Sequence, residues 1–194
     1  MLTSAEFCYF CTKDVFMTPQ VDYGLLKAAI RNVPDFPRTG IQFKDITTVI
    51  QRPEFLSQIV DDLAFHYGPM GITRVVAIES RGFLTGGALA FKLGAGLVPV
   101  RKPGKLPSAT FSVSYDLEYG KDTLEIHKDA LHEDDIVLLH DDLLATGGTA
   151  LAAIHLLRNF NIHHIYAGFI VELDFLHGRQ RLLPFSEVYS LIHF

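Results

Sequence analysis

Two adjacent carboxylates and a loop of glycines and hydroxyls follow an apolar run near the middle of the chain. The segment reads Ile136-Val-Leu-Leu-His-Asp-Asp-Leu-Leu-Ala-Thr-Gly-Gly-Thr149. Asp141 and Asp142 repel each other and need a ligand that favours both charges. Ribose hydroxyls donate hydrogen bonds and Mg²⁺ prefers oxygen ligands, so a metal-bound sugar phosphate would supply one. Gly147 and Gly148 allow the backbone to approach such a ligand closely. These residue types and their spacing indicate a sugar-phosphate site.

The elements around this segment support the same interpretation. The apolar run 136–139 predicts a strand that is buried on both faces of a parallel sheet. Ligands of open α/β sheets bind at the carboxyl ends of strands, where the two carboxylates are expected. The residues from Ala150 onward predict a helix, whose amino end offers unpaired N–H groups and a positive dipole to a phosphate. Thr146 and Thr149 add hydroxyl donors beside it.

Helices and strands are predicted to alternate along the chain, which is typical of an α/β fold with βαβ units. We expect helices over 20–32, 53–67, 83–93 and 149–159. We expect strands over 74–78, 97–100, 136–140 and 164–172. A loop is expected over 33–45, and a two-stranded excursion lies within 101–131. An excursion of that size usually serves a site.

The segment Asp141 to Thr149 resembles the phosphoribosyl pyrophosphate (PRPP) signature of the type I phosphoribosyltransferase family, most closely its adenine-specific branch. Further segments resemble the same branch in the same order, over roughly residues 20 to 190. They are Val33-Pro-Asp-Phe-Pro-Arg-Thr-Gly-Ile-Gln-Phe-Lys-Asp-Ile46, Ile78-Glu-Ser-Arg-Gly-Phe83, Val100-Arg-Lys-Pro-Gly-Lys-Leu-Pro107, Ser114-Tyr-Asp-Leu-Glu-Tyr-Gly120, and Val171-Glu-Leu with Gly178-Arg179.

The resemblance implies a type I phosphoribosyltransferase fold. This is a twisted, mostly parallel sheet flanked by helices, with a flexible lid hairpin and a small N-terminal hood. Residues 20–194 would form one domain with its lid at about 101–131, while residues 1–19 would be an extension that is disordered or not translated. Met17 is a candidate start for translation. The implied reaction transfers the 5-phosphoribosyl group from PRPP to N9 of adenine, giving AMP and pyrophosphate in purine salvage.

The resemblance also assigns roles to residues, position by position. Glu118 would be the catalytic acid that donates to N7 as N9 loses its proton, and Asp141 and Asp142 would hold the ribose hydroxyls. Mg²⁺ would be bound mainly by PRPP and water, with both aspartates in its outer coordination sphere. The 5′-phosphate would lie against Ala145, Thr146, Gly147, Gly148 and Thr149. Pyrophosphate would contact Ser80, Arg81, Lys102, Lys105 and Tyr119. Adenine would contact Ile41, Gln42, Phe43, Lys44 and Arg81.

Two residues depart from the family pattern, and a third feature is expected in the backbone. Gln42 and His140 stand where apolar residues are usual. Because Gln42 lies in the segment that would contact the base, a relaxed or different purine preference is an alternative. We expect His140 to hydrogen-bond to neighbouring backbone or to a neighbouring strand. In the family, the loop that corresponds to Glu79-Ser-Arg-Gly82 carries a non-proline cis peptide bond, so the Glu79–Ser80 bond is expected to be cis.

Other function classes are less consistent with the sequence. A non-catalytic PRPP sensor remains an alternative, although known sensors carry an added DNA-binding domain. A generic nucleotide-binding protein would contain Gly-x-Gly-x-x-Gly or a P-loop ending in Gly-Lys-Thr, and neither is present. One zinc half-site at Cys8 and Cys11 has no second pair of ligands.

The charge is distributed unevenly. Residues 71–110 hold six basic residues and one acid, whereas residues 111–142 hold ten acids and two basic residues. A basic half and an acidic half that face each other would suit a pyrophosphorylated sugar with its Mg²⁺. The formal net charge of −5 argues against nucleic acid as a partner, and no apolar run reaches membrane-spanning length. A cytoplasmic protein is therefore expected, and the resemblance implies a homodimer.

Overall fold

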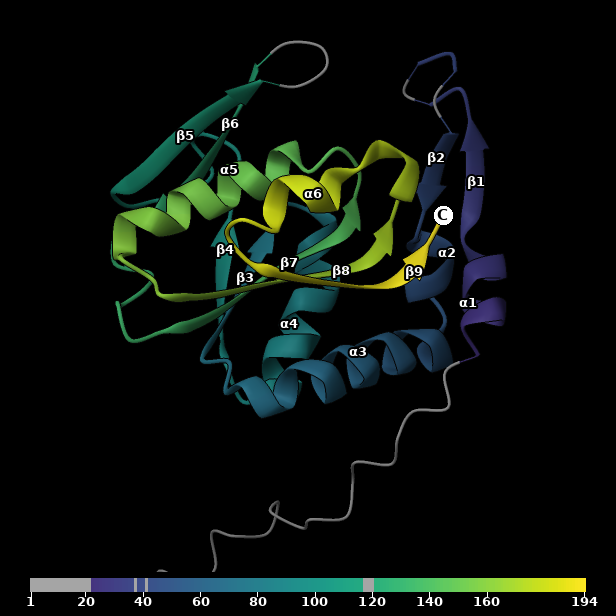
Figure 1. Cartoon of the computed structure of the whole chain (residues 1–194), viewed down its shortest axis with the longest axis horizontal. Helices are drawn as coiled ribbons and strands as arrows, with labels where there is room; N and C mark the ends of the chain where they lie inside the picture. Colours follow the sequence, from purple (N-terminus) through teal and green to yellow (C-terminus); the bar gives the residue numbers. More distant parts are fainter. Residues whose placement is uncertain (1–21, 37, 41, 117–120) are drawn as a thin grey trace, which may run out of the picture.

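A five-stranded parallel sheet forms the centre of the molecule (Figure 1). The computed structural model describes residues 22–36, 38–40, 42–116 and 121–194. The strand order is β4-β3-β7-β8-β9, and each neighbouring pair is parallel. The strands are β3 (Arg74–Ile78), β4 (Gly96–Val100), β7 (Ile136–Leu144), β8 (His164–Glu172) and β9 (Glu187–His193). The predicted α/β fold class, with a mostly parallel sheet, is confirmed.

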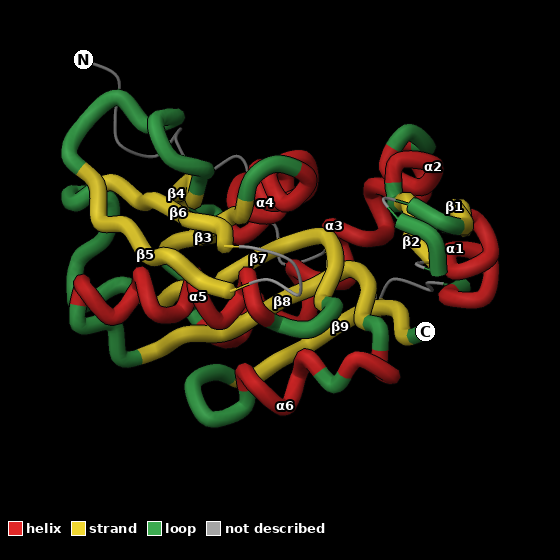
Figure 2. The backbone as a smooth tube through the Cα atoms, turned by 90° about the horizontal axis from the view of Figure 1, so that it is seen from above, coloured by secondary structure: helices red, strands yellow, loops and turns green. Residues whose placement is uncertain are grey.

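Helices cover both faces of the sheet. α3 and α4 lie on one face, and α5 and α6 lie on the other (Figures 1 and 2). Their bounds are α3 Pro53–Tyr67, α4 Arg81–Leu93, α5 Gly148–Leu157 and α6 Gly178–Leu182. Short 3₁₀ segments occur at Gly68–Met70, Arg158–Phe160 and Asp174–Leu176. Within the described parts of the chain, no helix combines the length and apolar character that crossing a membrane requires.

The strongest sequence signals gave the most accurate boundaries. β3 and β8 consist mainly of apolar residues, and the last four residues of β3 and the last six of β8 are buried, as expected for strands with both faces covered. α3 begins with Pro53 at its first position, where the missing N–H has no helical partner to lose. Each of these three elements has the predicted bounds.

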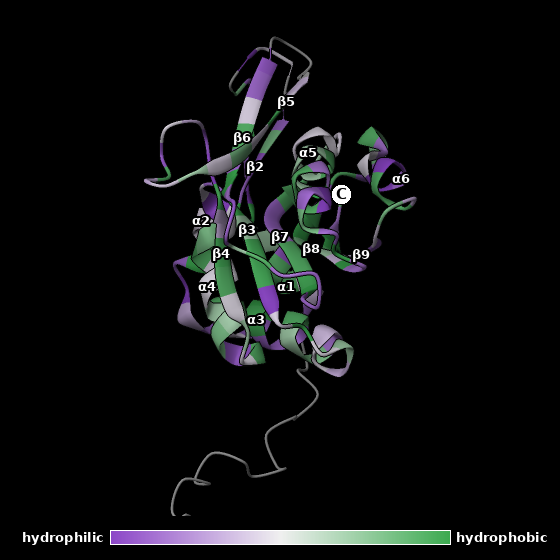
Figure 3. Cartoon of the chain, turned by 90° about the vertical axis from the view of Figure 1, so that its left-hand side faces the viewer, coloured by the Kyte–Doolittle hydropathy of each residue, from purple (hydrophilic) through white to green (hydrophobic). Residues whose placement is uncertain are grey.

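Buried apolar side chains form one cluster on each face of the sheet. The cluster under α5 includes Val76, Leu139 and Ile154, and the cluster under α3 and α4 includes Leu63, Val75 and Leu138. Hydrophobic residues are correspondingly concentrated in the central strands, and the first residues of β6 are hydrophilic (Figure 3). The sheet is therefore held rigidly from both sides.

Two antiparallel hairpins stand at opposite sides of the sheet (Figures 1 and 2). They are β1 (Arg31–Pro34) with β2 (Gln42–Asp45), and β5 (Thr110–Asp116) with β6 (Lys121–His127). The second is the expected two-stranded excursion. The first was expected as a loop, and that prediction is wrong because β1 and β2 pair in register from Arg31 with Asp45 to Pro34 with Gln42.

Several other boundaries differ from those expected. The helix expected over 20–32 is α1 (Tyr23–Ala29), a short helix α2 (Thr47–Ile50) follows the first hairpin, and β9 was not predicted. β7 continues to Leu144 because β8 pairs alongside it as far as Glu172. The two aspartates expected after the strand are therefore part of it.

Candidate active site

A cleft opens where β7 leads into α5. One cavity of about 210 Å³ is lined by Arg81 and by the continuous segment 141–150. A second cavity of about 330 Å³ adjoins it, with Arg81, Asp141, Asp142 and Thr149 in both linings. The predicted ribose and 5′-phosphate residues therefore share one cavity, and the second extends from it toward the β5–β6 hairpin.

The loop 145–147 joins β7 to the amino end of α5. Gly147 is the N-cap residue of α5 and has φ of 77°, a left-handed conformation that other residues adopt at a cost. No side chain caps the helix there. The first N–H groups of α5 are thus available for an anion, which the helix dipole also favours.

The paired carboxylates lie at the bottom of the cleft. Asp142 is buried with 3% exposure, and its Oδ2 lies 2.8 Å from Arg81 Nε. This contact is an ion pair without hydrogen-bond geometry, and Oδ2 accepts no hydrogen bond from the described residues. The backbone N–H of Asp142 donates to Asp141 Oδ1 at 2.9 Å.

Burial and mutual repulsion set the protonation of this pair. Burial raises the pKa of Asp141 well above its usual value, and the charge of Asp142 raises it further. Burial also raises the pKa of Asp142, while the Arg81 guanidinium opposes that rise. Full ionisation of both carboxylates therefore needs more hydrogen-bond donors or positive charge than the described residues supply. Hydroxyl groups of a sugar or a hydrated cation would supply them.

The loop after β3 brings the amino end of α4 against β7. A Cβ at Gly82 would lie 2.9 Å from Asp141 Oδ1 and 3.0 Å from His140 O, so a side chain there would collide with the strand. The Glu79–Ser80 peptide bond is cis, as expected. This loop places Arg81 and Ser80 at the cleft, and Ser80 lines the second cavity.

His140 is a structural residue beneath the site. It is fully buried, its Nε2 is 2.7 Å from Thr85 Oγ1, and its Nδ1 is 2.9 Å from Gly168 O. Burial lowers its pKa to about 4, so the ring is neutral at ordinary pH. The prediction that His140 hydrogen-bonds to a neighbouring strand is confirmed.

Glu79 organises the base of the hairpin. Its carboxylate binds Arg101 Nη2 at 3.0 Å and accepts the backbone N–H of Lys102 at 2.9 Å. The hydrogen bond from Arg101 holds the pKa of Glu79 below its usual value. Lys102 thereby reaches the second cavity, where its ammonium group pairs with Asp122.

Tyr115 and Asp122 also line this second cavity, and sequence reasoning missed both. They face each other across the hairpin, and the Tyr115 hydroxyl lies 3.3 Å from both Asp122 Oδ2 and Thr149 Oγ1. The strand alternation of β6 offered a signal. Asp122 shares its face with the buried residues Leu124 and Ile126, so it must point inward.

The predicted adenine residues lie in different surroundings. Phe43 packs edge-to-face on Phe36 with ring centroids 5.1 Å apart, and the Arg81 guanidinium lies 4.9 Å from the Phe43 ring centroid. Gln42 is exposed and accepts a hydrogen bond from Asn32 at 2.7 Å. Lys44 lies over the Phe194 ring at 3.9 Å. The structure thus brings Phe43 to Arg81, whereas Gln42 and Lys44 contact residues of β1 and the C-terminus.

Some predicted residues are elsewhere or outside the described part of the chain. Lys105 is exposed and lines neither cavity, and its carbonyl oxygen accepts a hydrogen bond from Arg101 at 3.0 Å. The predictions for Ile41, Glu118 and Tyr119 concern residues outside those that the structure describes. The same holds for Cys8, Cys11 and Met17, and for the proposed extension 1–19.

Comparison with known proteins agrees with this fold and cleft. The Phosphoribosyl transferase domain family matches residues 45–181. An adenine phosphoribosyltransferase of Trichlorobacter lovleyi is 53% identical over 169 residues, covering 87% of this chain and 98% of the relative.

Solved structures give the same result. The adenine phosphoribosyltransferase of Thermoanaerobacter pseudethanolicus is 46% identical with a TM-score of 0.85, covering 89% of this chain and 99% of that one. The Giardia lamblia enzyme, solved with 9-deazaadenine, is 40% identical with a TM-score of 0.86, covering 90% and 98%.

The parallel sheet, the carboxylate pair and the glycine loop at the start of α5 define a phosphoribosyltransferase. The likeness to these relatives extends along nearly their whole length. The chain therefore belongs to the adenine phosphoribosyltransferases within the phosphoribosyl transferase domain family.

Proposed function

We infer that this protein transfers the 5-phosphoribosyl group of PRPP to N9 of adenine, releasing AMP and pyrophosphate. The observation that carries this proposal is the continuous cleft from loop 145–147 to Lys102, with Asp141 and Asp142 between them. A phosphate at the amino end of α5 would then leave the ribose beside the carboxylates. The pyrophosphate would lie toward Arg81 and Lys102, where the cations are.

The reaction itself depends mainly on charge. Displacement of pyrophosphate builds positive charge on the ribose ring, which the two buried carboxylates stabilise. Arg81 and Lys102 stabilise the negative charge of the leaving group. The backbone N–H groups of α5 and the hydroxyls of Thr146 and Thr149 orient the 5′-phosphate.

Mg²⁺ fits this site because the site offers carboxylate oxygen atoms, which Mg²⁺ and its bound waters prefer. The Oδ2 atom of Asp142, which accepts no hydrogen bond from the described residues, and the adjacent Asp141 carboxylate suit a hydrated cation and ribose hydroxyls. Bound Mg²⁺ would supply neutralisation of the pyrophosphate oxygens. The aspartates would hold the ion through water, and Arg81 would be the protein cation that contacts the pyrophosphate directly.

Adenine would contact the side chain of Phe43 and the backbone of Arg81. The apolar ring of Phe43 at one side of the cleft supports this assignment. Because Gln42 accepts a hydrogen bond from Asn32, it supplies no necessary polar contact to a base. A strict preference for adenine is therefore our expectation, and a relaxed purine preference is the alternative.

One assay separates these alternatives. The protein is incubated with PRPP, Mg²⁺ and adenine, hypoxanthine or guanine in turn, and nucleotide formation is followed by chromatography. AMP from adenine alone is the expected result. Nucleotide from several purines would establish the relaxed preference. PRPP binding without any nucleotide would indicate a sensor.

Glu118 is proposed as the acid that donates to N7 while N9 loses its proton. Glu118→Leu is expected to reduce kcat by roughly 10²-fold or more, with PRPP binding retained, because only proton transfer is lost. Glu133→Leu is the control, since Glu133 is an exposed acid away from the cleft. Equal turnover in the two variants would remove Glu118 from the mechanism.

We also propose that two copies associate through the outer face of α4 and the edge strand β4. Leu84, Phe91 and Leu97 are 54%, 89% and 46% exposed on this face. A groove of about 380 Å³ between α3 and α4 has Phe91 in its lining. A group of large exposed apolar side chains is typical of protein–protein surfaces. A second copy of the chain would also cover the open edge of β4.

A further inference from the structure

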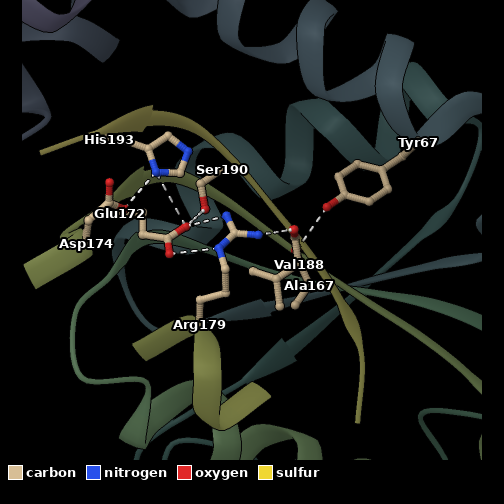
Figure 4. Close-up of polar contacts among 8 residues, drawn as sticks. All are labelled: Tyr67, Ala167, Glu172, Asp174, Arg179, Val188, Ser190 and His193. Atoms are coloured by element: carbon tan, nitrogen blue, oxygen red, sulfur yellow. Dashed lines mark hydrogen bonds and ion pairs between the residues drawn. The ribbon is translucent and has the colours of Figure 1, made fainter. Parts of the chain in front are cut away.

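An ion pair joins Glu172 at the end of β8 to Arg179 near the start of α6, and neither residue lines the cleft (Figure 4). Arg179 Nε donates to Glu172 Oε1 at 2.9 Å, and Arg179 Nη2 donates to Oε2 at 2.5 Å. Glu172 is only 3% exposed, and Ser190 Oγ donates to its Oε2 at 2.7 Å. Arg179 Nη1 also donates to Val188 O at 2.6 Å. One arginine thus ties α6 to both β8 and β9.

The charges of Glu172 and Arg179 neutralise each other, which argues against a metal ion beside Glu172. Asp174 and His193 lie beside Glu172, and their ligand atoms are close enough together for a cation. The Arg179 guanidinium already neutralises Glu172, however, and His193 Nδ1 is paired with Asp174 at 2.8 Å. A two-pronged pair of this kind fixes the orientation of α6 instead.

The residue before Arg179 lies directly against the loop at the start of α5. A Cβ on Gly178 would collide with Ala145 O and would lie 2.9 Å from Gly147 N. In the other direction, a Cβ on Gly147 would lie 2.7 Å from Gly178 O. The two backbones therefore touch at positions where only glycine fits.

A side chain strengthens the same contact. Arg181 Nη1 donates to Thr146 O at 3.1 Å, from the exposed side of α6. Loop 145–147 thus has α6 packed behind it through Gly178 and bonded to it through Arg181. The position of α6 itself depends on Arg179 and Glu172.

We propose that Glu172, Gly178, Arg179 and Arg181 form a brace that positions loop 145–147 for a sugar 5′-phosphate. None of the four lines either cavity, so they act through the loop as positioning residues. This inference rests on the proposed function for the identity of the ligand. The inference adds that affinity for the phosphate depends on an ion pair outside the cleft, between the buried Glu172 and the partly exposed Arg179.

The most direct test adds one methyl group to the contact. Gly178→Ala is compared with Gly68→Ala, because a Cβ at Gly68 meets nothing within 4 Å. The dissociation constant of ribose 5-phosphate is measured by calorimetry for both variants. Gly178→Ala is expected to weaken binding roughly 10-fold or more, since misplacement of a binding loop by about 1 Å has effects of that order. Gly68→Ala is expected to bind as the wild type does.

Milder variants keep the test decisive if Gly178→Ala does not fold. Arg181→Ala removes an exposed side chain, and Arg179→Lys keeps the charge but loses the two-pronged geometry. Each is expected to weaken ribose 5-phosphate binding roughly 3- to 10-fold and to raise the KM for PRPP, with the KM for adenine within about 2-fold. Circular dichroism identifies the folded variants.

Two results would overturn the proposal that these residues form a brace. One is wild-type binding of ribose 5-phosphate by folded Arg181→Ala and Arg179→Lys. The other is an equal rise in both KM values, which would indicate general destabilisation. Failure of the proposed function is distinguishable, because it would appear as wild-type protein that forms no AMP. The binding measurement needs no turnover.

Discussion

At the scale of single residues, the site is dominated by two carboxylates that the fold forces together. Asp141 and Asp142 are successive residues of β7, and β8 pairs alongside this part of the strand, with Asp141 opposite Phe169. A raised carboxylate pKa means that the folded state keeps a proton that the unfolded chain has lost. The contribution of the pair to stability is therefore fully present at low pH and is lost as the pH rises through the folded pKa. At neutral pH the pair destabilises the protein.

Asp141→Asn should therefore separate stability from function. The uncharged amide removes the repulsion, so the melting temperature at pH 7 is expected to rise by about 2–4 °C, equivalent to ~1 kcal/mol in a chain of this size. The same change should weaken PRPP binding at least several-fold. Calorimetric unfolding at pH 7 and pH 4 tests the first part, with a smaller gain at pH 4. A lower melting temperature at pH 7 would contradict it.

At the scale of elements, the β5–β6 hairpin places an acid where a pyrophosphate would bind. Asp122 pairs with Lys102 in the second cavity, and this pairing raises the pKa of Lys102. The hydrogen bond from Lys102 also helps to lower the pKa of Asp122, against the effect of its burial. A pyrophosphate bound at Lys102 as proposed would share the ammonium group with Asp122 or displace it. Under that proposal, Asp122 competes with the leaving group.

Removal of this competitor should strengthen pyrophosphate binding. For Asp122→Asn we expect the dissociation constant of pyrophosphate to fall about 5-fold, since a partly exposed ion pair contributes ~1 kcal/mol or less. Glu133→Gln removes one negative charge outside the cleft and controls for net charge. Calorimetric titration with magnesium pyrophosphate makes the comparison. The same change in both variants would exclude a local effect.

The elements also show how much of the fold can be predicted from the sequence. β3, α3 and β8 were predicted with their bounds because mainly apolar residues mark the two strands and an initial proline marks the helix. β1 was missed because three of its four residues are exposed, so it has no apolar alternation. The signature predicted the carboxylates and loop 145–147. The signature does not include Tyr115 and Asp122, whose positions depend on the register of the β5–β6 hairpin. It also does not include α6, which is distant in sequence from loop 145–147 and contacts it only in the folded structure.

At the scale of the whole molecule, one face remains apolar without an internal partner in the described chain. Phe91 is 89% exposed, which is unusual for so large a hydrocarbon side chain. It lies on α4, whose amino end carries Arg81 into the cleft. Association through this face would therefore fix the position of α4, the helix that places Arg81 in the cleft.

Phe91→Glu is expected to convert a dimer into a monomer. A buried charge at the centre of an apolar interface should weaken association by roughly 30-fold or more, the effect of losing one central anchor residue. Sedimentation velocity over a range of protein concentrations measures this. Leu25→Glu is the control, because Leu25 is also exposed but lies on α1. A wild-type monomer, or a Phe91→Glu dimer, would remove this face as the interface.

The carboxylate pair on β7 also makes donor binding a reaction that involves protons. Burial and repulsion give Asp141 and Asp142 a greater affinity for protons than ordinary aspartates have. Hydroxyl donors and a hydrated cation, bound as proposed, would favour the fully ionised pair and expel any proton that the pair still holds. Protons and the donor would then compete for this position, and uptake of the sugar would release protons.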